Sequence, residues 1–295
     1  MATREHMHRG RRSEGLISPR VGNILFNGLV YVIILSGAFV LMVPFAWMVS
    51  TSLKLPGDVF DWPPKWLPDP VVWRNYPQAW SYLPFNTFLK NTLIITAFGV
   101  FGQTLTSSLV GYSFARLRWI GRDVLFVVVL ATMMLPFHVT MIPVFAIWKT
   151  LGFVDTFVPL IAPAFFGGGA FNIFLMRQFF MTIPLELDDA AKIDGCNIIA
   201  IYWRIIMPLS KAVVGTVAIF SFLGNWNDFL GPLIYLNSTQ KYTLALGLQL
   251  FRGQYNTQWA LLMAASVIVM MPVLVIYFLA QRYFVQGIVF TGIKG

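Results

Sequence analysis

The chain of 295 residues is 57% hydrophobic and only 11% charged, with a mean hydropathy of +0.70, whereas a soluble domain carries about 25% charged residues. This composition excludes a cytosolic globular protein, and an aromatic content of 16% excludes a disordered chain. In a membrane protein, the net charge of +9 must be judged by position, so it is no sign of nucleic-acid binding. The single cysteine, Cys196, excludes an internal disulfide, and no Cys and His pattern that would hold zinc is present.

Six apolar stretches are long enough to cross a bilayer, which takes about 20 helical residues. In chain order they run from about 21 to 53, 90 to 116, 123 to 149, 156 to 176, 212 to 236 and 257 to 280. Because bilayer helices tolerate proline, we expect kinks more than breaks at prolines such as Pro136 and Pro143. The sequence predicts an all-α polytopic membrane protein with a transmembrane domain over 21–280, a basic N-terminal tail over 1–20 and a C-terminal tail over 281–295.

The basic residues concentrate in alternate loops. With both termini inside, fourteen of the 21 Lys and Arg residues fall in inner segments and seven in outer segments. Since cytoplasmic loops carry the excess of Lys and Arg, we predict a multi-pass protein with both termini in the cytoplasm. The first apolar stretch follows a basic arm, as in a signal peptide, but it is about twice the usual 7 to 15 residues long, so we expect it to remain as an anchor.

The longest outer segment, 54–88, is rich in tryptophan and tyrosine. Its aromatic residues of these two types are Trp62, Trp66, Trp73, Tyr76, Trp80 and Tyr82. Trp and Tyr settle at the level of the lipid headgroups, which is one interpretation of this segment. Docking of an external partner is the other.

The inner loop 177–211 contains two helical patterns. The first covers 184–195: Thr182 is expected to cap it, acidic residues favour its N-terminal end, and Gly195 is expected to end it in the left-handed conformation. In the second, apolar residues recur at helical spacing and Pro208 is expected to end the helix. These apolar residues are Ile198, Ile201, Tyr202 and Ile205. The loop therefore predicts a helix-turn-helix on the inner face of the membrane.

The surface of the first loop helix suits a protein contact. The side chains of the adjacent Ala190 and Ala191 are small, so another protein can approach the helix backbone closely there. Neighbouring carboxylates and Lys192 form a polar rim around them. A helix pair that rests on lipid headgroups is the alternative, although the anionic inner leaflet would repel the four acidic residues. We therefore predict a docking element for a cytoplasmic protein.

The spacing within this loop resembles that of a known family. Asp189-Ala190-Ala191, three residues, Gly195, nine residues and Ile205-Ile206-Met207-Pro208 match the pattern E-A-A-x3-G-x9-I-x-L-P of ABC importer permeases. Asp189 stands in place of Glu and Met207 in place of Leu. The C-terminal residues and the stretch 227–233 are similar to permeases of the carbohydrate-uptake branch, above all to the smaller permease of maltose transporters. The resemblance covers 21–295.

The resemblance implies that the loop helix inserts into a groove on a cytoplasmic ATPase and relays its closure to the membrane helices. The ATPase-coupling residues that it implies are Glu186, Asp189, Ala190, Ala191, Asp194, Gly195 and Pro208. In relatives the C-terminal tail also reaches the ATPase, and the corresponding residues here are Gln286, Gly287 and Lys294.

The resemblance also implies a set of partners in a prokaryotic cytoplasmic membrane. They are a second homologous permease, two ATPase subunits, an extracytoplasmic solute-binding protein and the surrounding membrane lipid. Because the chain has no phosphate-binding loop, we expect it to be non-catalytic, with no cofactor or metal of its own and with ATP and Mg bound by the partner ATPase.

Polar residues within the predicted spans are candidates for the path of the cargo, because an ionisable group inside a bilayer costs about 2.5 to 3.5 kcal/mol. The candidates are Gln103, Asn225, Trp226, Asn227 and Asp228. Amides and carboxylates match sugar hydroxyls, and an aromatic face suits a sugar ring. A capping or interfacial role is an equal alternative for Asp228. By resemblance, the expected cargo is a sugar, an oligosaccharide or a related polyol.

A rival function is an ion-coupled secondary transporter that uses Asp228 and His138, although a structural role suits His138 better. Other polar residues are expected either to line a channel or to form hydrogen bonds between helices, and the sequence favours the hydrogen bonds. These residues are Thr104, Thr106, Ser107, Ser108 and Asn172. The run from Gly167 to Gly169 predicts a close backbone approach or a break in the fourth span.

Overall fold

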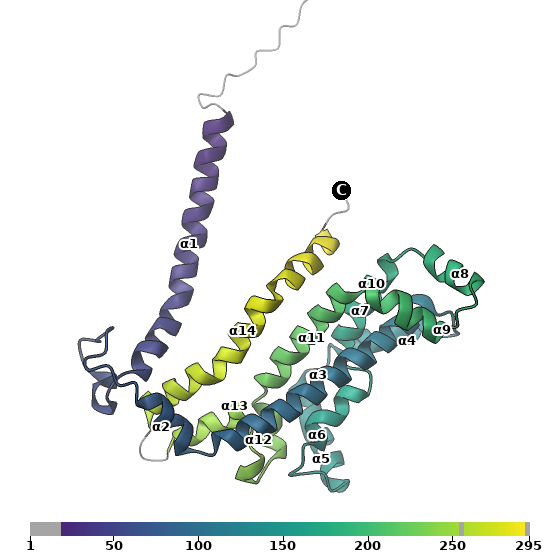
Figure 1. The fold of residues 1–295 in the computed structure, drawn as a ribbon. Coiled ribbons are helices and arrows are strands. Elements are labelled where there is room, and N and C mark those ends of the chain that lie inside the picture. Colours follow the sequence, from purple (N-terminus) through teal and green to yellow (C-terminus); the bar gives the residue numbers. More distant parts are fainter. Residues whose placement is uncertain (1–18, 254–256, 293–295) are drawn as a thin grey trace, which may run out of the picture.

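The computed structural model describes residues 19–253 and 257–292, and in these ranges the regular elements are helices (Figure 1). In chain order they are α1 (Pro19–Ser52), η1 (Pro56–Phe60), α2 (Asn75–Tyr82), α3 (Phe85–Arg116), α4 (Arg122–Thr132), α5 (Phe137–Thr150), α6 (Val158–Ile161), η2 (Ala162–Phe165), α7 (Ala170–Thr182), α8 (Glu186–Ile193), α9 (Ile198–Ile201), η3 (Tyr202–Ile206), α10 (Met207–Leu209), α11 (Lys211–Trp226), α12 (Leu230–Tyr235), η4 (Thr239–Lys241), α13 (Leu244–Leu248), η5 (Gln249–Phe251) and α14 (Trp259–Gly292). The predicted all-α class is confirmed. Most of the predicted basic tail, 1–18, lies outside the described residues.

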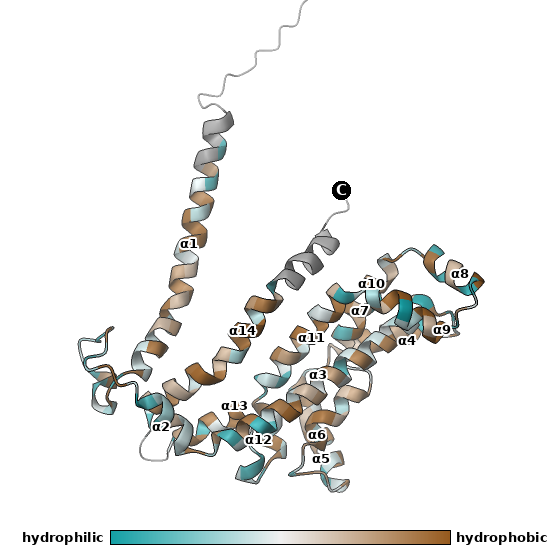
Figure 2. Cartoon of the chain, viewed as in Figure 1, coloured by the Kyte–Doolittle hydropathy of each residue, from teal (hydrophilic) through white to brown (hydrophobic). Residues whose placement is uncertain are grey.

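The long helix α3 is the centre of the packing. It contacts α7 and α11 along much of its length, while α1 contacts α14 near the C-terminal end of α1 (Figure 1). Figure 1 shows the N-terminal end of α1, the segment α8 to α9 and the C-terminal end of α14 toward one side of the molecule, and α2, α12 and α13 toward the other. In Figure 2 the middle parts of the helices are largely hydrophobic, as lipid contact and helix packing require.

Four helical segments are long and apolar enough to cross a membrane. They are Phe26–Ser52, Phe85–Arg116, Val158–Thr182 and Trp259–Gln281. Two further pairs reach this length only when their bent halves are joined, and these are Arg122–Thr132 with Phe137–Thr150, and Ile198–Leu209 with Lys211–Trp226. The described part of the chain therefore holds four to six candidate spans, and the count of six stays a prediction.

The third predicted span is broken. Its halves, α4 and α5, meet at 99°, and Pro136 precedes α5 with an extended backbone. Proline lacks an N–H group and disfavours the helical conformation of the residue before it, so the two halves do not form one helix. The expectation of a kink was therefore wrong at Pro136, whereas Pro143 lies inside α5 as expected.

The fifth predicted span, 212–236, is also interrupted. α11 ends at Trp226 and α12 begins at Leu230, so the continuous helix expected here was wrong. With 16 residues, α11 is about 24 Å long at 1.5 Å per residue, which is shorter than the hydrocarbon core of a bilayer. The break leaves backbone and polar side chains between two helices, and those that lie within a bilayer need partners within the protein.

The glycine run in the fourth span produces both of the expected features. Gly167, Gly168 and Gly169 have φ angles of 95°, 71° and 92°, and they separate η2 from α7. A Cβ atom on Gly168 would lie 2.3 Å from the carbonyl oxygen of Gln103. The glycines therefore allow the break between η2 and α7 and the close approach of this turn to α3.

Replacing Gly168 by Ala is expected to destabilise the protein more than replacing Gly169 by Ala. Both changes place a Cβ at positive φ, which costs roughly 1 to 2 kcal/mol, but no heavy atom lies within 4 Å of the Cβ position of Gly169. The clash with α3 should add about 1 to 3 kcal/mol in the Gly168 variant. Thermal unfolding of the two purified variants measures the difference, and equal stability would contradict the close packing.

The inner loop folds into two helical segments joined through Gly195. Gly195 has a φ of 80°, and the Cys196 N–H group donates to the Ala191 carbonyl at 2.9 Å, which closes the end of α8 as expected. The second segment runs through α9, η3 and α10. The residues of η3 form a π-helical turn, and the segment ends at Leu209.

The caps of these segments differ from the expected ones. Thr182 Oγ1 donates to the Phe179 carbonyl in its own helix at 2.7 Å, and α8 begins without a side-chain cap, so the predicted capping by Thr182 was wrong. Pro208 lies inside α10 and does not end it, because a proline in the first turn of a helix costs no hydrogen bond. Asn197 Oδ1, which the pattern did not indicate, accepts from the Ala200 N–H at 2.8 Å and caps α9.

Candidate functional site

A cavity of about 740 Å³ lies between α3, α5, α7, α11 and α12, with residues of α6 and η2 in its wall. Its polar lining residues are Gln103, Thr140, Asn172, Ser221, Asn225 and Asp228. Its aromatic lining residues are Phe137, Trp148, Phe171, Phe220 and Tyr235. A largely apolar cavity with a few convergent polar groups is typical of a site for a small ligand. Of the predicted path residues, Gln103, Asn225 and Asp228 are brought together here.

Two amide side chains join α3 to α11 at the wall of the cavity. Asn225 Nδ2 donates to the Ser221 carbonyl at 2.7 Å and lies 3.4 Å from Gln103 Oε1. A Cβ atom on Gly99 would lie 2.4 Å from Asn225 Oδ1, so the glycine gives Asn225 room against α3. Amides of this kind can donate to and accept from ligand hydroxyls.

Asp228 lies in the break between α11 and α12 and faces the cavity. Its Oδ1 atom accepts from the Gly231 N–H at 3.1 Å, so the carboxylate caps the start of α12. A Cβ atom on Gly231 would lie 2.3 Å from Asp228 Oδ2, and glycine is therefore needed for this contact. The capping role expected for Asp228 is thus combined with a place in the cavity wall.

The neighbouring candidates lie elsewhere. Trp226 is only 3% exposed, and its Nε1 atom donates to the Val269 carbonyl of α14 at 3.2 Å. Asn227 is exposed and donates to the Leu223 carbonyl at 2.9 Å. Successive helical positions point about 100° apart, so adjacent side chains do not share a face. Neither residue lines the cavity, nor does His138, which is exposed beside the ring of Phe137.

Some of the expected hydrogen bonds between helices are present. Thr106 Oγ1 donates to the Ala164 carbonyl of η2 at 2.9 Å, and Ser108 Oγ lies 2.6 Å from the Tyr202 hydroxyl. Asn172 instead donates to the Gly168 carbonyl in its own segment at 2.8 Å and lines the cavity. Thr140 also lines the cavity, although the sequence did not indicate it as a candidate. Most of the residues around it are apolar on all sides of α5, so the sequence does not show which face of this helix points toward the cavity.

The second part of the candidate site is the outer surface of the inner loop. Most of the predicted coupling residues are exposed on it: Glu186, Asp189, Ala190, Asp194, Gly195 and Pro208. Ala191 was expected beside Ala190 on this surface, but it is 4% exposed and packs into the core cluster beneath the loop, so that expectation was wrong. Adjacent residues of α8 point about 100° apart, and here Ala190 faces outward whereas Ala191 faces the protein interior.

Exposed apolar residues accompany these polar ones. Ile193 is 87% exposed and Ile199 is 69% exposed, and the Asp189 carboxylate accepts from Lys192 Nζ at 2.9 Å. Exposed apolar side chains within a polar rim are a feature of protein interfaces. For the predicted tail residues Gln286 and Gly287 only the helical backbone of α14 is described, and Lys294 lies outside the described residues.

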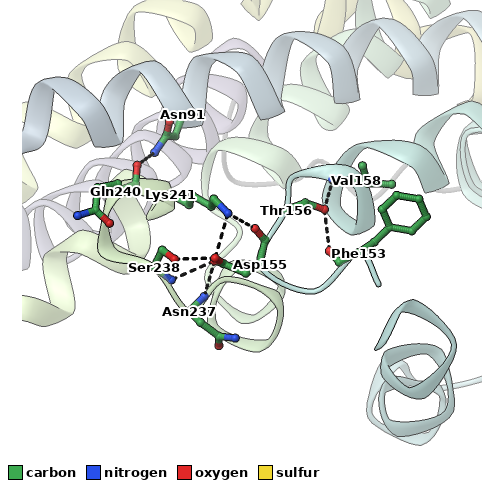
Figure 3. A network of polar contacts seen from close by, with 9 residues as sticks. All are labelled: Asn91, Phe153, Asp155, Thr156, Val158, Asn237, Ser238, Gln240 and Lys241. Carbon is green, nitrogen blue, oxygen red and sulfur yellow. Dashed lines mark hydrogen bonds and ion pairs between the residues drawn. The ribbon is translucent and has the colours of Figure 1, made fainter. Parts of the chain in front are cut away.

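A network of polar contacts centred on Asp155 joins the loop between α5 and α6 to the segment that follows α12 (Figure 3). Helices α5, α6 and α12 all contribute residues to the cavity wall. The Asp155 carboxylate accepts from the N–H groups of Asn237 and Ser238 at 3.0 Å each, from Ser238 Oγ at 2.6 Å and from Lys241 Nζ at 2.9 Å. The Asp155 N–H group donates to the Tyr235 carbonyl at 2.7 Å. The network thereby fastens the loop between α5 and α6 to the end of α12.

The hydrogen bonds from Ser238, followed by those from Lys241 and Asn237, lower the pKa of Asp155 below its ordinary value. Replacing Asp155 by Asn is expected to lower the apparent Tm by roughly 2 to 4 °C, the shift that about 1 kcal/mol causes in a protein of this size class. Because the folded-state pKa is the lower one, the stabilisation is complete above about pH 4 and is lost as the pH falls through the folded-state value.

Thermal unfolding in detergent at several pH values measures this effect. The difference in Tm between wild type and the Asp155→Asn variant should stay constant from about pH 8 to pH 5 and shrink below about pH 4. The exposed Asp69 offers a matched control in another loop, and its Asn variant should show no such difference. A difference that does not change with pH would contradict the role of the Asp155 charge.

Comparison with known proteins identifies the family of this chain. Residues 107–290 match the family of binding-protein-dependent transport system inner membrane components. The arabinooligosaccharides transport system permease protein AraQ of Bacillus subtilis is 36% identical over 208 residues, which cover 70% of this chain and 72% of the relative. The sn-glycerol-3-phosphate transport system permease protein UgpE of Yersinia pestis is 30% identical over 283 residues, which cover 93% of this chain and 99% of the relative.

A solved structure shares the fold. In the crystal structure of a bacterial ABC transporter involved in the import of the acidic polysaccharide alginate, one chain superposes with a TM-score of 0.80 at 24% identity, covering 92% of this chain and 99% of that chain. The helical architecture, the matched family residues and the identity to transport permeases agree with the resemblance found in the inner loop. This chain therefore belongs to the family of binding-protein-dependent transport system inner membrane components, which are ABC transporter permeases.

Proposed function

We propose that this chain is a permease subunit of an ABC importer and forms half of the translocation path for a sugar, an oligosaccharide or a related polyol. The observation that carries the proposal is the cavity, which places the amides of Gln103 and Asn225 and the Asp228 carboxylate beside aromatic side chains. Such a lining suits a ligand that is rich in hydroxyl groups. The named cargoes of relatives, arabinooligosaccharides and sn-glycerol-3-phosphate, are also rich in hydroxyl groups.

In the proposed mechanism the inner loop, from Asp189 to Pro208, couples the permease to a cytoplasmic ATPase. The exposed face of α8, with Glu186, Asp189, Ala190 and the apolar Ile193, would enter a groove on the ATPase. ATP binding would favour one packing of the membrane helices, and hydrolysis would release it. The permease contributes no catalytic residue, and ATP and Mg belong to the partner.

The remaining parts of the proposal concern assembly. The chain would pair with a second, homologous permease, two ATPase subunits and an extracytoplasmic solute-binding protein. It would cross the cytoplasmic membrane six times with both termini inside, with 54–88 outside and 177–211 in the cytoplasm. The C-terminal tail from 281, with Gln286, Gly287 and Lys294, would reach the ATPase pair.

An ion-coupled transporter is the alternative function. It would need Asp228 and His138 at one ion site, but Asp228 lines the cavity whereas the His138 side chain is exposed outside it. This placement favours the ATP-driven function.

Reconstitution tests the proposal directly. The chain is placed in proteoliposomes with its second permease, ATPase and solute-binding protein, and uptake of arabinotriose, maltotriose and sn-glycerol 3-phosphate is measured. Uptake that requires ATP and survives collapse of ion gradients supports the proposal. Uptake that continues without ATP and stops when proton or sodium gradients collapse would establish the alternative.

A further inference from the structure

A buried ion pair joins the inner loop to the end of α3. Arg116 is the last residue of α3 and Asp188 lies in the first turn of α8. Their side chains are only 2% and 7% exposed, with 3.8 Å between Arg116 Nε and Asp188 Oδ2. Arg116 also donates from Nη2 to the Ile183 carbonyl at 2.6 Å. One guanidinium thus holds both the chain that leads into α8 and the first turn of α8.

The stability of the fold does not account for this pair. Arg116 Nε and Asp188 Oδ1 are buried without a hydrogen-bond partner, so part of the cost of removing both charges from water is not recovered. Replacing a buried ion pair by neutral residues is often harmless to stability, and the best-attested use of such pairs is to impose one register or arrangement. The pair is therefore suited to holding α8 in one position against α3.

Further contacts follow the same face of α3 away from the loop. The Tyr112 hydroxyl donates to the Ile198 carbonyl at 3.4 Å, and Ser108 Oγ lies 2.6 Å from the Tyr202 hydroxyl. Positions 108, 112 and 116 are four residues apart and lie on one helix face. Both segments of the inner loop are thus fixed to a single stripe of α3.

The same helix reaches the cavity. Gln103, which lines the cavity beside Asn225, lies thirteen positions before Arg116 on α3, or about 20 Å along the axis. An α-helix transmits a displacement along its axis because its backbone hydrogen bonds keep it rigid. Motion imposed on the Arg116 end of α3 would therefore be carried toward the wall of the cavity.

We propose that Arg116 and Asp188 are a positioning pair that makes α3 move with the inner loop, so that displacement of α8 by the ATPase alters the cavity. This inference rests on the proposed function and extends it to two residues outside the docking surface. Asp188 faces the protein interior, whereas its neighbour Asp189 is exposed and pairs with Lys192. Loss of the Asp188 charge should therefore leave binding of the ATPase to α8 unchanged but weaken the coupling between displacement of α8 and movement of α3.

A cysteine placed in the cavity wall can report whether ATP binding at the ATPase changes the cavity, and this measurement does not require the cargo to be known. Because Cys196 is the only cysteine, a Cys196→Ser, Thr140→Cys parent carries one thiol, in the cavity. In the complex with the second permease and the ATPase subunits, the rate of alkylation by N-ethylmaleimide is measured with and without ATP and Mg²⁺. We expect ATP to change the rate in the parent.

Adding Asp188→Asn should reduce this ATP-dependent change about fivefold or more, the lower end of typical coupling effects, while ATPase binding to the permease is unchanged. Asp188→Glu keeps the charge and should retain at least half of the response. Asp123→Asn removes a carboxylate that is exposed and paired with Arg122, and it should respond as the parent does.

A full response in the Asp188→Asn complex would overturn the inference and leave the proposed function intact. A parent that binds the ATPase but shows no response to ATP would contradict both. If the Asp188→Asn chain fails to assemble, Arg116→Lys decides, because it keeps the charge balance but loses the planar fork that grips Ile183 and Asp188. A reduced response in that variant supports the inference, and a full response overturns it.

Discussion

Replacing Gly195 by Val is expected to reduce ATP-driven uptake at least tenfold while the chain still reaches the membrane. Gly195 has a φ of 80°, and no heavy atom lies within 4 Å of its Cβ position, so a new Cβ atom meets no neighbour. The left-handed conformation nevertheless costs a non-glycine residue roughly 1 to 2 kcal/mol, and more for a β-branched one. The turn between α8 and α9 should relax, and the proposed docking surface would lose its shape. Uptake and permease abundance are measured in the same proteoliposomes.

Two control variants test whether the effect depends on backbone strain and on the position of Gly195 in the inner loop. Asn tolerates the left-handed conformation, so Gly195→Asn should retain most of the uptake. Gly152→Val introduces the same strain at a φ of 76°, also in open space, but in the loop after α5, away from the inner loop. It should leave the coupling of ATP hydrolysis to uptake unchanged. Normal uptake by Gly195→Val would refute the role of this turn in coupling.

Replacing Asn225 by Leu is expected to lower uptake about tenfold or more. Leu has a similar size, but it removes the donor to Ser221 and the contact with Gln103, and it leaves the Gln103 amide at the cavity wall with one partner fewer. An unpaired polar group costs about 1 to 3 kcal/mol when it is fully buried and less when it is half-buried like Gln103, and the cavity also loses an amide that could bind hydroxyls. Initial rates of uptake are compared with the amount of assembled complex.

Asn227→Leu is the control for this change. Asn227 is the same residue type two positions further along, yet its side chain is exposed and bonds only to the backbone of its own helix among the contacts described. The variant should therefore transport at close to the wild-type rate. Equal losses in the two variants would show that the amide of Asn225 has no specific part in the path.

Several features could be predicted from local sequence because they depend on local chemistry. Long apolar stretches marked the membrane helices, and Gly195 marked the end of α8, since each reflects the preference of a short segment. The spacing from Asp189 to Pro208 indicated the family, which the comparisons confirmed. By contrast, Thr182 was wrongly expected to cap α8, because its hydroxyl can bond equally well to a carbonyl one turn back in its own helix.

The amino-acid sequence alone was enough for the helical class, the membrane setting and the family, since composition and motif spacing are properties of the chain. Only the packing of α3 against α7 and α11 decided that Asn225 faces the cavity while Trp226 and Asn227 do not, and that Ala191 is buried while Ala190 is exposed. The pairing of Arg116 with Asp188 likewise joins positions far apart in the chain. Which side of a helix faces a neighbour depends on that neighbour, and in a chain where both lipid and protein interior are apolar, hydrophobicity does not distinguish the two sides.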